Sequence, residues 1–258
     1  MSERSGYQPG VPCWVDLSST DVTLSAGFYG ELFGWELAVD PRPDSGGYGR
    51  FTLGGRAVAG VAPSFGEGAP SVWNVHVAVD DVAATAAKVR AAGGGVVLEP
   101  VRVFEHGWTA AFRDLSGAFF MAWQAEEMHG AELVGEPGAF AWSELVTRDT
   151  AAAEAFYPAV FGWEAREDGR GGAERTEWRA GGRPVAGMAP MGPRTPPDVP
   201  PHWLTHFAVA DLGAAVAKVG ELGGSVLTER VSTSRGPAAV VADPEFAPFA
   251  LLAPDRPG

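Results

Sequence analysis

Apolar and polar positions along the first 62 residues predict one strand, one helix and three further strands. Residues 13–18 alternate between apolar and polar types and favour a half-buried strand. Leu24, Phe28, Leu32 and Phe33 then recur at helical spacing, which places them on one apolar face. Strands follow at 35–39, 50–53 and 57–62, with a loop rich in Pro, Gly and Asp at 41–49.

Capping residues mark both ends of this helix. Thr20 or Asp21 offers a side-chain oxygen to the free backbone N–H groups of the first turn. Gly34 ends the helix, because glycine tolerates the left-handed backbone that closes a helix. The pair Gly54-Gly55 is typical of a hairpin turn between the last two strands.

The same order returns more loosely in the next segment. Residues 73–79 form a predicted strand, Asp80 or Asp81 caps a helix that runs through Ala91, and Gly93 ends it. Alternation then predicts strands at 96–103, 107–113 and 118–124.

An aromatic motif shows that the whole pattern is duplicated. Phe28-Tyr29 and Phe33-Gly34-Trp35-Glu36 recur 128 positions later as Phe156-Tyr157 and Phe161-Gly162-Trp163-Glu164. The sequence therefore predicts an α+β protein of four βαβββ units in two pairs. The predicted domains are 1–127 and 138–258, and the polar, Gly-rich stretch 128–137 is the predicted linker.

Composition limits the function classes. The net charge of -13, with only 19 scattered basic residues, argues against nucleic-acid binding. The single cysteine, Cys13, allows no internal disulfide and no cysteine-based metal site. The first 12 residues lack the apolar core of a secretory signal, and no apolar run is long enough for a membrane span. We therefore expect a cytoplasmic protein without a membrane partner.

A capped helix carrying Phe-Tyr, a Phe-Gly-Trp exit into a strand and a later Asp-x-x-Gly turn resemble the vicinal oxygen chelate superfamily. That superfamily includes glyoxalases, bleomycin-resistance proteins and extradiol dioxygenases. The resemblance implies that each pair of units curls into one mixed sheet, giving two glyoxalase-like domains, each with a concave side that holds a ligand. It fixes the fold better than the function, because one fold supports many chemistries.

Enzymes of the family usually hold a divalent metal in the concavity. The resemblance places the ligand positions of the first domain at Trp14, Asn74, Ala59 or Gly60, and Met121. The matching positions of the second domain are Trp142, Leu204, Ala186 or Gly187, and Ala250. Divalent ions in such sites need imidazole or carboxylate ligands. We therefore predict a protein without a metal or other cofactor; a glyoxalase-like metalloenzyme stays an alternative if the strand alignment is shifted by one residue.

Strand periodicity predicts a polar group in each concavity. Residues two apart share a face, so Asp16 lies on the face of Trp14, and His76 on the face of Asn74. The family fold sets the first strands of the two units side by side, which would let Asp16 meet His76 and, in the second domain, Glu144 meet His206. Such a pair can serve general acid or base catalysis. It can equally be a buried polar pair that fixes strand register.

Aromatic side chains are the other candidates for ligand contact. Flat organic ligands suit sites lined by aromatic rings and a few polar groups. The candidate ligand-binding residues are Trp14, Asn74, Trp108, Met121, Trp123 and Trp142, and Trp73 and Trp203 lie on strands whose faces could also line the concavities. Tyr29 and Tyr157 are expected at the helix edge, with the hydroxyl near the surface.

Three functions remain open. The favoured one is a metal-independent protein that binds a small, flat molecule, as bleomycin-resistance proteins do. A second is a metal-independent lyase, isomerase or cyclase that uses the histidine and the carboxylate. A third is a scaffold whose concavities are filled by Trp14, Met121 and Trp123. The duplication predicts either a monomer with internal pseudo-symmetry or a homodimer.

Overall fold

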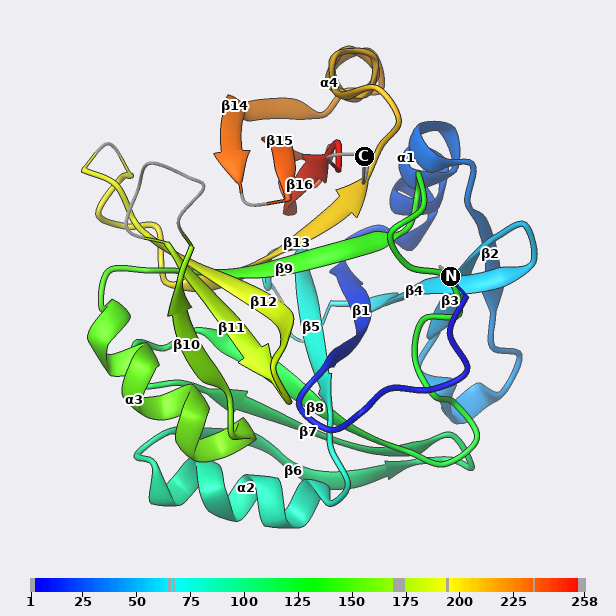
Figure 1. The fold of residues 1–258 in the computed structure, drawn as a ribbon. Helices are drawn as coiled ribbons and strands as arrows, with labels where there is room; N and C mark the ends of the chain where they lie inside the picture. The colour runs from blue at the N-terminus through cyan, green and yellow to red at the C-terminus, as the bar shows by residue number, and fades with distance from the viewer. Residues whose placement is uncertain are drawn as a thin grey trace.

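A computed structural model describes residues 3–64, 66, 68–168, 175–193, 195–233 and 235–254. The chain forms two eight-stranded mixed sheets, each made from two βαβββ units, which confirms the predicted fold class and the four-unit order (Figure 1). The ends of the two predicted domains, at residues 1 and 258, lie outside the described residues.

The first half of the chain carries eight strands, two helices and one short 3-10 turn. Its elements are β1 (Pro12–Ser19), α1 (Val22–Phe33), β2 (Glu36–Val39), η1 (Pro43–Ser45), β3 (Gly49–Leu53), β4 (Arg56–Pro63), β5 (Val72–Ala78), α2 (Val82–Ala91), β6 (Gly95–Val103), β7 (Gly107–Arg113) and β8 (Phe119–Ala125).

The second half repeats this order. Its elements are β9 (Phe140–Thr147), α3 (Thr150–Phe161), β10 (Glu164–Glu167), β11 (Thr176–Ala180), β12 (Arg183–Pro190), β13 (His202–Ala208), α4 (Leu212–Glu221), β14 (Ser225–Thr233), β15 (Gly236–Ala242) and β16 (Pro248–Leu252). No helix among the described residues is long and apolar enough to cross a membrane.

The first strands of paired units meet at the centre of each sheet. The strand order is β2-β3-β4-β1-β5-β8-β7-β6 in one sheet and β10-β11-β12-β9-β13-β16-β15-β14 in the other. β1 is antiparallel to β5 and β9 is antiparallel to β13. These central pairings bring side chains from two different units onto one face.

Aspartate caps begin all four helices. Asp21, Asp81, Asp149 and Asp211 each accept a hydrogen bond from a backbone N–H of the first turn. α1 ends at Gly34, whose φ of 76° is left-handed, as predicted.

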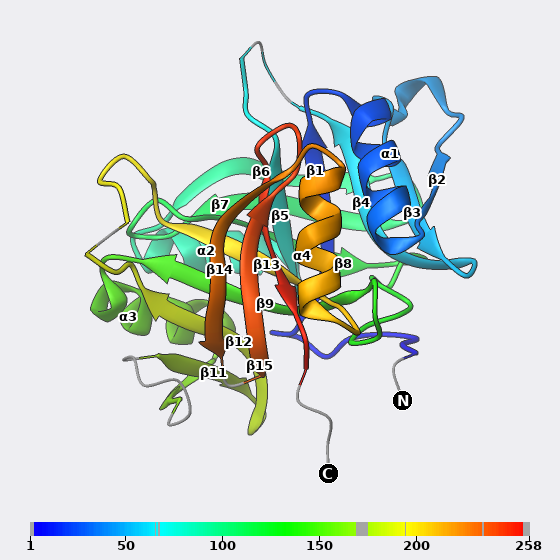
Figure 2. The same ribbon diagram turned by 90° about the horizontal axis from the view of Figure 1, so that it is seen from above.

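The helices pack between the two halves of the molecule. α1 lies beside α4 and α2 lies beside α3 (Figures 1 and 2). Phe28 of α1 packs edge-on against Phe249 of the second sheet, and Phe156 of α3 packs against Phe120 of the first. The two halves therefore share one core of aromatic rings.

Two buried tyrosines join the halves, and their position corrects the expectation of a surface hydroxyl. Tyr29 accepts a hydrogen bond from Trp73 Nε1 and donates to Asp243 of the other half, at 2.9 Å each. Tyr157 repeats the arrangement, accepting from Trp203 and donating to Asp114. Both tyrosines are fully buried, because the opposite half of the chain covers each of them: Phe249 packs on Tyr29 and Phe120 on Tyr157.

Candidate functional site

The concave face of the first sheet, here called the N-terminal cup, gathers a polar group at its centre. Asp16 lies opposite Asn74 in the antiparallel pairing of β1 with β5, and His76 lies opposite Trp14. Because residues two apart point to the same side, Trp14, Asp16, Asn74 and His76 share this face. Their odd-numbered neighbours, such as Val15 and Val75, belong to the core beneath the helices.

Asp16 is the centre of this polar group. Its Oδ1 accepts from Asn74 Nδ2 at 2.9 Å, and its Oδ2 lies 2.9 Å from His76 Nε2, which donates to it. Asn74 also donates to Ser18 at 3.0 Å. Burial acts against ionisation of Asp16, but the His76 imidazole and the Asn74 amide outweigh it and lower the pKa of this carboxyl. The group thus holds a carboxylate and orients an imidazole.

His76 has one ring nitrogen to spare. Its side chain is 5% exposed, and its Nδ1 is buried without a hydrogen-bond partner among the described residues. A buried polar atom of this kind is uncommon, and it is available to accept a donor or, when protonated, to donate. Met121, on the strand next to His76, is half-buried and forms part of the same floor.

One end of the N-terminal cup is filled by the protein itself. Trp14 and Trp123 are buried in a small apolar cluster that includes Tyr7 of the N-terminal segment and Met128 of the linker. Trp123 Nε1 donates to Met128 O, and Tyr7 donates to Ala131 O. The scaffold hypothesis therefore holds for the Trp14–Trp123 end, whereas Asp16 and Met121 stay partly exposed at the other end.

Tyr48, at the end of the loop before β3, was missed by sequence reasoning. Trp14 Nε1 donates to the Tyr48 hydroxyl at 2.9 Å. A Cβ at Gly60 would lie 2.0 Å from that hydroxyl and 2.9 Å from Asp16 Cβ, so glycine leaves the room that the phenol occupies. Gly60 lies directly beside Asp16. The signal was a glycine at a strand centre, which marks a close approach of another group.

The residues at the family's metal positions do not fit a divalent ion. In the N-terminal cup they are Trp14, Asn74, Gly60 and Met121, and the space at Gly60 is occupied by Tyr48. Asn74 already donates to Asp16 and Ser18. An amide and a thioether are poor substitutes for imidazole and carboxylate ligands. In the second sheet the residues are Trp142, Leu204, Gly187 and Ala250, none of which has a suitable donor.

A group of metal-type side chains does lie at the rim of the N-terminal cup. Within the described residues, Glu105, His106 and Glu127 bring their ligand atoms within 4.8 Å of one another. Arg42 already occupies this place: its guanidinium donates to Glu105 at 3.0 Å, lies 2.8 Å from His106 Nε2 and stacks on Phe104. A metal ion would have to displace the Arg42 guanidinium from this place. The contacts instead tie the β2–β3 loop to the β6–β7 turn, across the opening of the cup.

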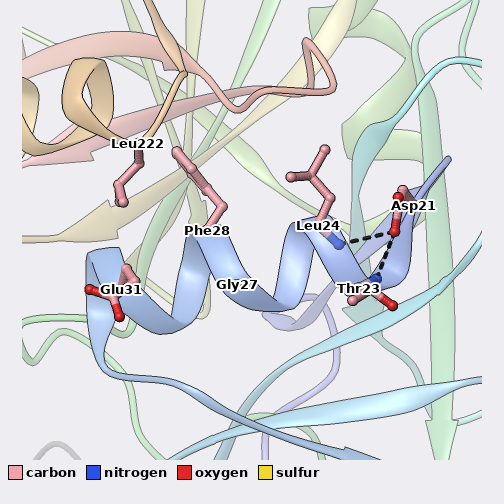
Figure 3. Close-up of a pocket in the computed structure, with 7 residues that line it drawn as sticks. All are labelled: Asp21, Thr23, Leu24, Gly27, Phe28, Glu31 and Leu222. Carbon is pink, nitrogen blue, oxygen red and sulfur yellow. Dashed lines mark hydrogen bonds between the residues drawn. The ribbon is translucent and has the colours of Figure 1, made fainter.

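Beside this rim is a hollow of about 240 Å³. The strand residue Arg50 and the turn residue His106 line it together with Tyr7, Met128 and Glu132, which come from the N-terminal segment and the linker. The hollow shows that these two segments form one wall of the cup opening. A second, shallow groove lies on the outer side of α1, between Leu24, Phe28 and Leu222, away from both cups (Figure 3).

The concave face of the second sheet, the C-terminal cup, is built differently. Glu144 forms a close ion pair with Arg175, and both side chains are mostly buried. Glu144 thus takes a partner other than the predicted His206. Arg175 follows a stretch outside the described residues, and no strand pattern pointed to it.

His206 lacks the carboxylate contact that His76 has. Its Nδ1 donates to the carbonyl oxygen of Leu204 at 3.2 Å. Burial lowers the pKa of His206; Glu144 opposes this shift, and the Arg175 guanidinium acts in the same direction as burial. His206 is therefore a neutral imidazole near pH 7.

Arg235 covers the aromatic end of the C-terminal cup. Its guanidinium carbon lies 3.9 Å from the centre of the Trp142 ring, and it has a loose ion pair with Glu177 at 3.9 Å. In the N-terminal cup Trp14 is bound by the Tyr48 hydroxyl instead, and His106 is the turn residue that corresponds to Arg235. Trp142 is thus closed off by an arginine of the same cup.

Trp108, a predicted ligand contact, and Trp73 and Trp203, whose strands were considered for the concavities, lie on the core side of the sheets. Trp108 packs against the core beneath the helices, and its Nε1 donates to Glu126 at 3.2 Å. Trp73 and Trp203 are buried in that same core. In β7, Thr109 and not Trp108 lies opposite Trp123, so Trp108 points to the other side of the sheet. The structure thus brings Asp16, His76, Asn74, Met121, Trp14 and Trp123 into one cup and leaves Trp108 outside it.

Comparison with known proteins agrees with this architecture. The family model described as the glyoxalase/bleomycin resistance protein/dioxygenase superfamily matches residues 14–121 and 128–246. The anthracycline biosynthesis protein DnrV of Streptomyces peucetius is 40% identical over 260 residues, covering 95% of this chain and 94% of that protein. The putative glyoxylase CFP32 of Mycobacterium tuberculosis is also 40% identical, covering 98% of both chains.

Solved structures share the fold at low identity. The Mn(II)-bound glyoxalase of Novosphingobium aromaticivorans superposes with a TM-score of 0.64 at 16% identity, covering 95% of this chain and 82% of that one. The 2,3-dioxygenase LapB of a Pseudomonas species gives a TM-score of 0.66 at 14% identity, covering 98% and 96%. These likenesses concern the fold alone.

Proposed function

The chain belongs to the glyoxalase/bleomycin resistance protein/dioxygenase superfamily, and from that premise we propose that it is a metal-independent protein that binds a flat, aromatic small molecule in its N-terminal cup. The observation that carries the proposal is the Asp16–His76 pair, which shares its face of the sheet with Trp14 and Met121. A few oriented polar groups on an apolar surface are typical of small-molecule sites.

The N-terminal cup suits a neutral organic ligand better than the C-terminal cup does. Asp16 holds a carboxylate whose oxygens each have a further lone pair, and His76 Nδ1 is unpartnered. In the C-terminal cup Glu144 is neutralised by Arg175, and Arg235 covers Trp142. A ligand entering there would have to break an existing ion pair.

Two further points support this function. The residues at the family's metal positions offer no set of imidazole or carboxylate ligands in either cup. The Streptomyces relative, at 40% identity over nearly the whole chain, has a name that connects it with the biosynthesis of an aromatic product. We extend to this chain only the class of ligand, a flat aromatic molecule.

A second candidate function is catalysis without a metal. The 2.9 Å contact between His76 Nε2 and Asp16 Oδ2 is the geometry by which a carboxylate orients a histidine, and it leaves Nδ1 to take or give a proton. In this function His76 is the general base or acid and Asp16 positions it. Isomerisation, elimination and cyclisation of an aromatic ketone are reactions that one such base can promote.

Ligand binding tests the first function. Purified protein is titrated with a panel of planar aromatic compounds, followed by tryptophan fluorescence and by the rise in melting temperature that a native-state ligand produces. Asp16→Asn and His76→Gln are expected to weaken binding about tenfold or more, since each removes a polar contact worth about 1.4 kcal/mol or more. Circular dichroism checks that each variant is folded.

The matched variant His206→Gln shows which of the two cups binds the ligand. Loss of affinity in His76→Gln but not in His206→Gln places the ligand in the N-terminal cup; the reverse result refutes that placement. Binding that disappears with a chelator and returns with one equivalent of a divalent metal would overturn metal independence. Turnover of a bound compound that is lost in His76→Gln while binding persists would favour the catalytic function.

A further inference from the structure

The Tyr48 hydroxyl and the Asp16 carboxylate form a donor–acceptor pair within the N-terminal cup. Tyr48 accepts a hydrogen bond from Trp14 Nε1, and no acceptor for its own proton occurs among the described residues. Asp16 accepts from Asn74 and His76 and keeps further lone pairs. A Cβ at Gly60 would lie 2.0 Å from the Tyr48 hydroxyl and 2.9 Å from Asp16 Cβ, so the two side chains adjoin the same glycine. Besides burial, the Asp16 charge also acts on the Tyr48 phenol and raises its pKa.

The two groups have fixed and opposite roles. Burial and the neighbouring Asp16 charge raise the pKa of Tyr48, so its phenol stays protonated and can donate. The Asp16 carboxylate, ionised near pH 7, can only accept. A ligand that satisfies both needs an acceptor oxygen and a hydroxyl donor on adjacent positions.

We infer that Tyr48 determines the ligand specificity of the N-terminal cup, together with Asp16, by selecting planar aromatic ketones that carry a hydroxyl beside the carbonyl. The carbonyl oxygen accepts from Tyr48 in place of the ligand's own hydroxyl, and that hydroxyl gives up its internal hydrogen bond to the carbonyl and donates to the charged Asp16 instead. This inference rests on the proposed function of the cup and names the ligand class for it. Neither group touches a metal or a cofactor in this arrangement.

The second half of the chain shows what the pair replaces. By the register of the paired strands, Arg175 stands where Tyr48 stands, and Glu144 where Asp16 stands. There the two side chains are opposite charges and bind each other. Tyr48 and Asp16 do not form an ion pair, because the phenol is neutral. The Asp16 carboxylate can therefore accept a hydrogen bond from a ligand, whereas Glu144 is already bound by Arg175.

Gly60 is required by this arrangement. A Cβ there would lie 2.0 Å from the Tyr48 hydroxyl and 2.7 Å from the ring carbon that bears it, so Tyr48 would be displaced. The equivalent Gly187 is less constrained, because a Cβ there would lie 3.0 Å from its nearest neighbour, Trp142 Nε1. Gly60→Ala and Gly187→Ala are therefore a matched pair of variants.

The experiment compares three probes: anthraquinone, 1-hydroxyanthraquinone and 2-hydroxyanthraquinone. The second has the hydroxyl beside a carbonyl, and the third has it at a distance. We expect the native protein to bind 1-hydroxyanthraquinone about tenfold more tightly than the other two, as one well-placed hydrogen bond to a charged group allows. Tyr48→Phe, which removes one oxygen atom, should weaken the binding of all three probes, because each has a carbonyl. It should also reduce the preference for 1-hydroxyanthraquinone, because the carbonyl no longer holds the neighbouring hydroxyl at Asp16.

Controls separate specificity from stability. Tyr7→Phe removes another tyrosine hydroxyl, one that donates to Ala131 O at the filled end of the cup, and should keep the preference. Gly60→Ala should lose it and Gly187→Ala should keep it; if Gly60→Ala fails to fold, Tyr48→Phe still decides the question.

The outcomes distinguish this inference from the proposed function. Equal affinity of the native protein for all three probes, or an unchanged preference in Tyr48→Phe, overturns the role of Tyr48 while aromatic binding stands. If none of the three probes binds, aromatic binding in the cup is refuted, and this inference is refuted with it.

Discussion

The two cups have the same scaffold and different chemistry. In the N-terminal cup Asp16 is held by the Asn74 amide and the His76 imidazole. In the C-terminal cup Glu144 is held by the guanidinium of Arg175, and Leu204 replaces Asn74. A carboxylate bound by an amide and an imidazole keeps lone pairs for a ligand, whereas one in a close ion pair with a guanidinium has its charge already balanced.

The difference shows which positions of a duplicated fold are free to change. Residues that hold the halves together are the same in both copies: Tyr29 matches Tyr157, and their partners Asp243 and Asp114 match each other. Some positions of the cups differ, as Asn74 does from Leu204 and Tyr48 from Arg175, because they contribute less to the shared core. We therefore expect the C-terminal cup to act mainly in stability and the N-terminal cup mainly in binding.

The largest effect should come from breaking the ion pair of the C-terminal cup. Arg175→Met leaves the buried Glu144 carboxylate without its partner, and we expect a loss of about 3–5 kcal/mol in the free energy of unfolding. Urea denaturation measures it. The double variant Glu144→Gln/Arg175→Met should recover most of the loss. A cost below about 1 kcal/mol for the single variant would show that the pair is solvated and that the cups differ less than described.

Much of the fold could be predicted because its signals are local. Helix caps such as Asp21 and Gly34, and the repeated aromatic motif, are visible within a few residues. The meeting of Asp16 with His76 followed from period-two alternation together with the family's strand order. These features depend on neighbours in sequence or on a known topology.

The partners that define the cups could not be predicted, because they come from distant loops. Arg175 reaches Glu144 from 31 positions away, and Tyr48 reaches Trp14 from a loop with no periodic pattern. Tyr29 meets Asp243 across 214 positions, so its burial depends on the other half of the chain. Trp108 was predicted to contact a ligand, but it lies in β7 with its side chain against the core.

The next largest effect should come from removing the tyrosine hydrogen bonds that join the two halves of the chain. Tyr29→Phe leaves Oδ2 of the buried Asp243 without a donor and Trp73 Nε1 without an acceptor. Tyr157→Phe does the same to Oδ2 of Asp114 and to Trp203 Nε1. Each should cost about 1–3 kcal/mol in the free energy of unfolding. Because both bonds cross between the halves, we expect one cooperative transition in calorimetry for the native protein and for each variant. Two separated transitions would show that the cups belong to independent units.

The cups should also respond to acid at different pH. The pKa of His206 is lowered in the folded state, so the unfolded chain takes up the proton first and stability falls as the pH falls below about 6.5. Each unit by which the pKa is lowered contributes about 1.4 kcal/mol to that loss. The pKa of Asp16 is lowered too, and its contribution is present above about pH 3.9 and is lost as the pH falls through the folded-state value.

Chemical denaturation between pH 7.5 and 5 measures the first loss, and His206→Gln should flatten the profile in that range. Asp16→Asn should leave this range unaltered and change the profile at lower pH. A proton NMR titration that gives His206 an ordinary pKa, or an unchanged profile in His206→Gln, would contradict the neutral, buried imidazole of the C-terminal cup.

The smallest effect is expected at Trp108, and it tests the boundary of the N-terminal cup. The indole lies on the helix side of β7, partly exposed, with one 3.2 Å bond to the exposed Glu126, and Pro237 takes its place in the other half. Trp108→Phe keeps most of the apolar contact, so the free energy of unfolding should change by no more than about 0.5 kcal/mol. The affinity for an aromatic ligand should be the same as that of the native protein. Trp123→Phe is the matched change inside the cup: it removes the bond to Met128 O that holds the linker against the opening, and it should weaken ligand binding. If Trp108→Phe weakened binding as much as Trp123→Phe, the ligand would lie on the opposite face of the sheet from Asp16 and His76.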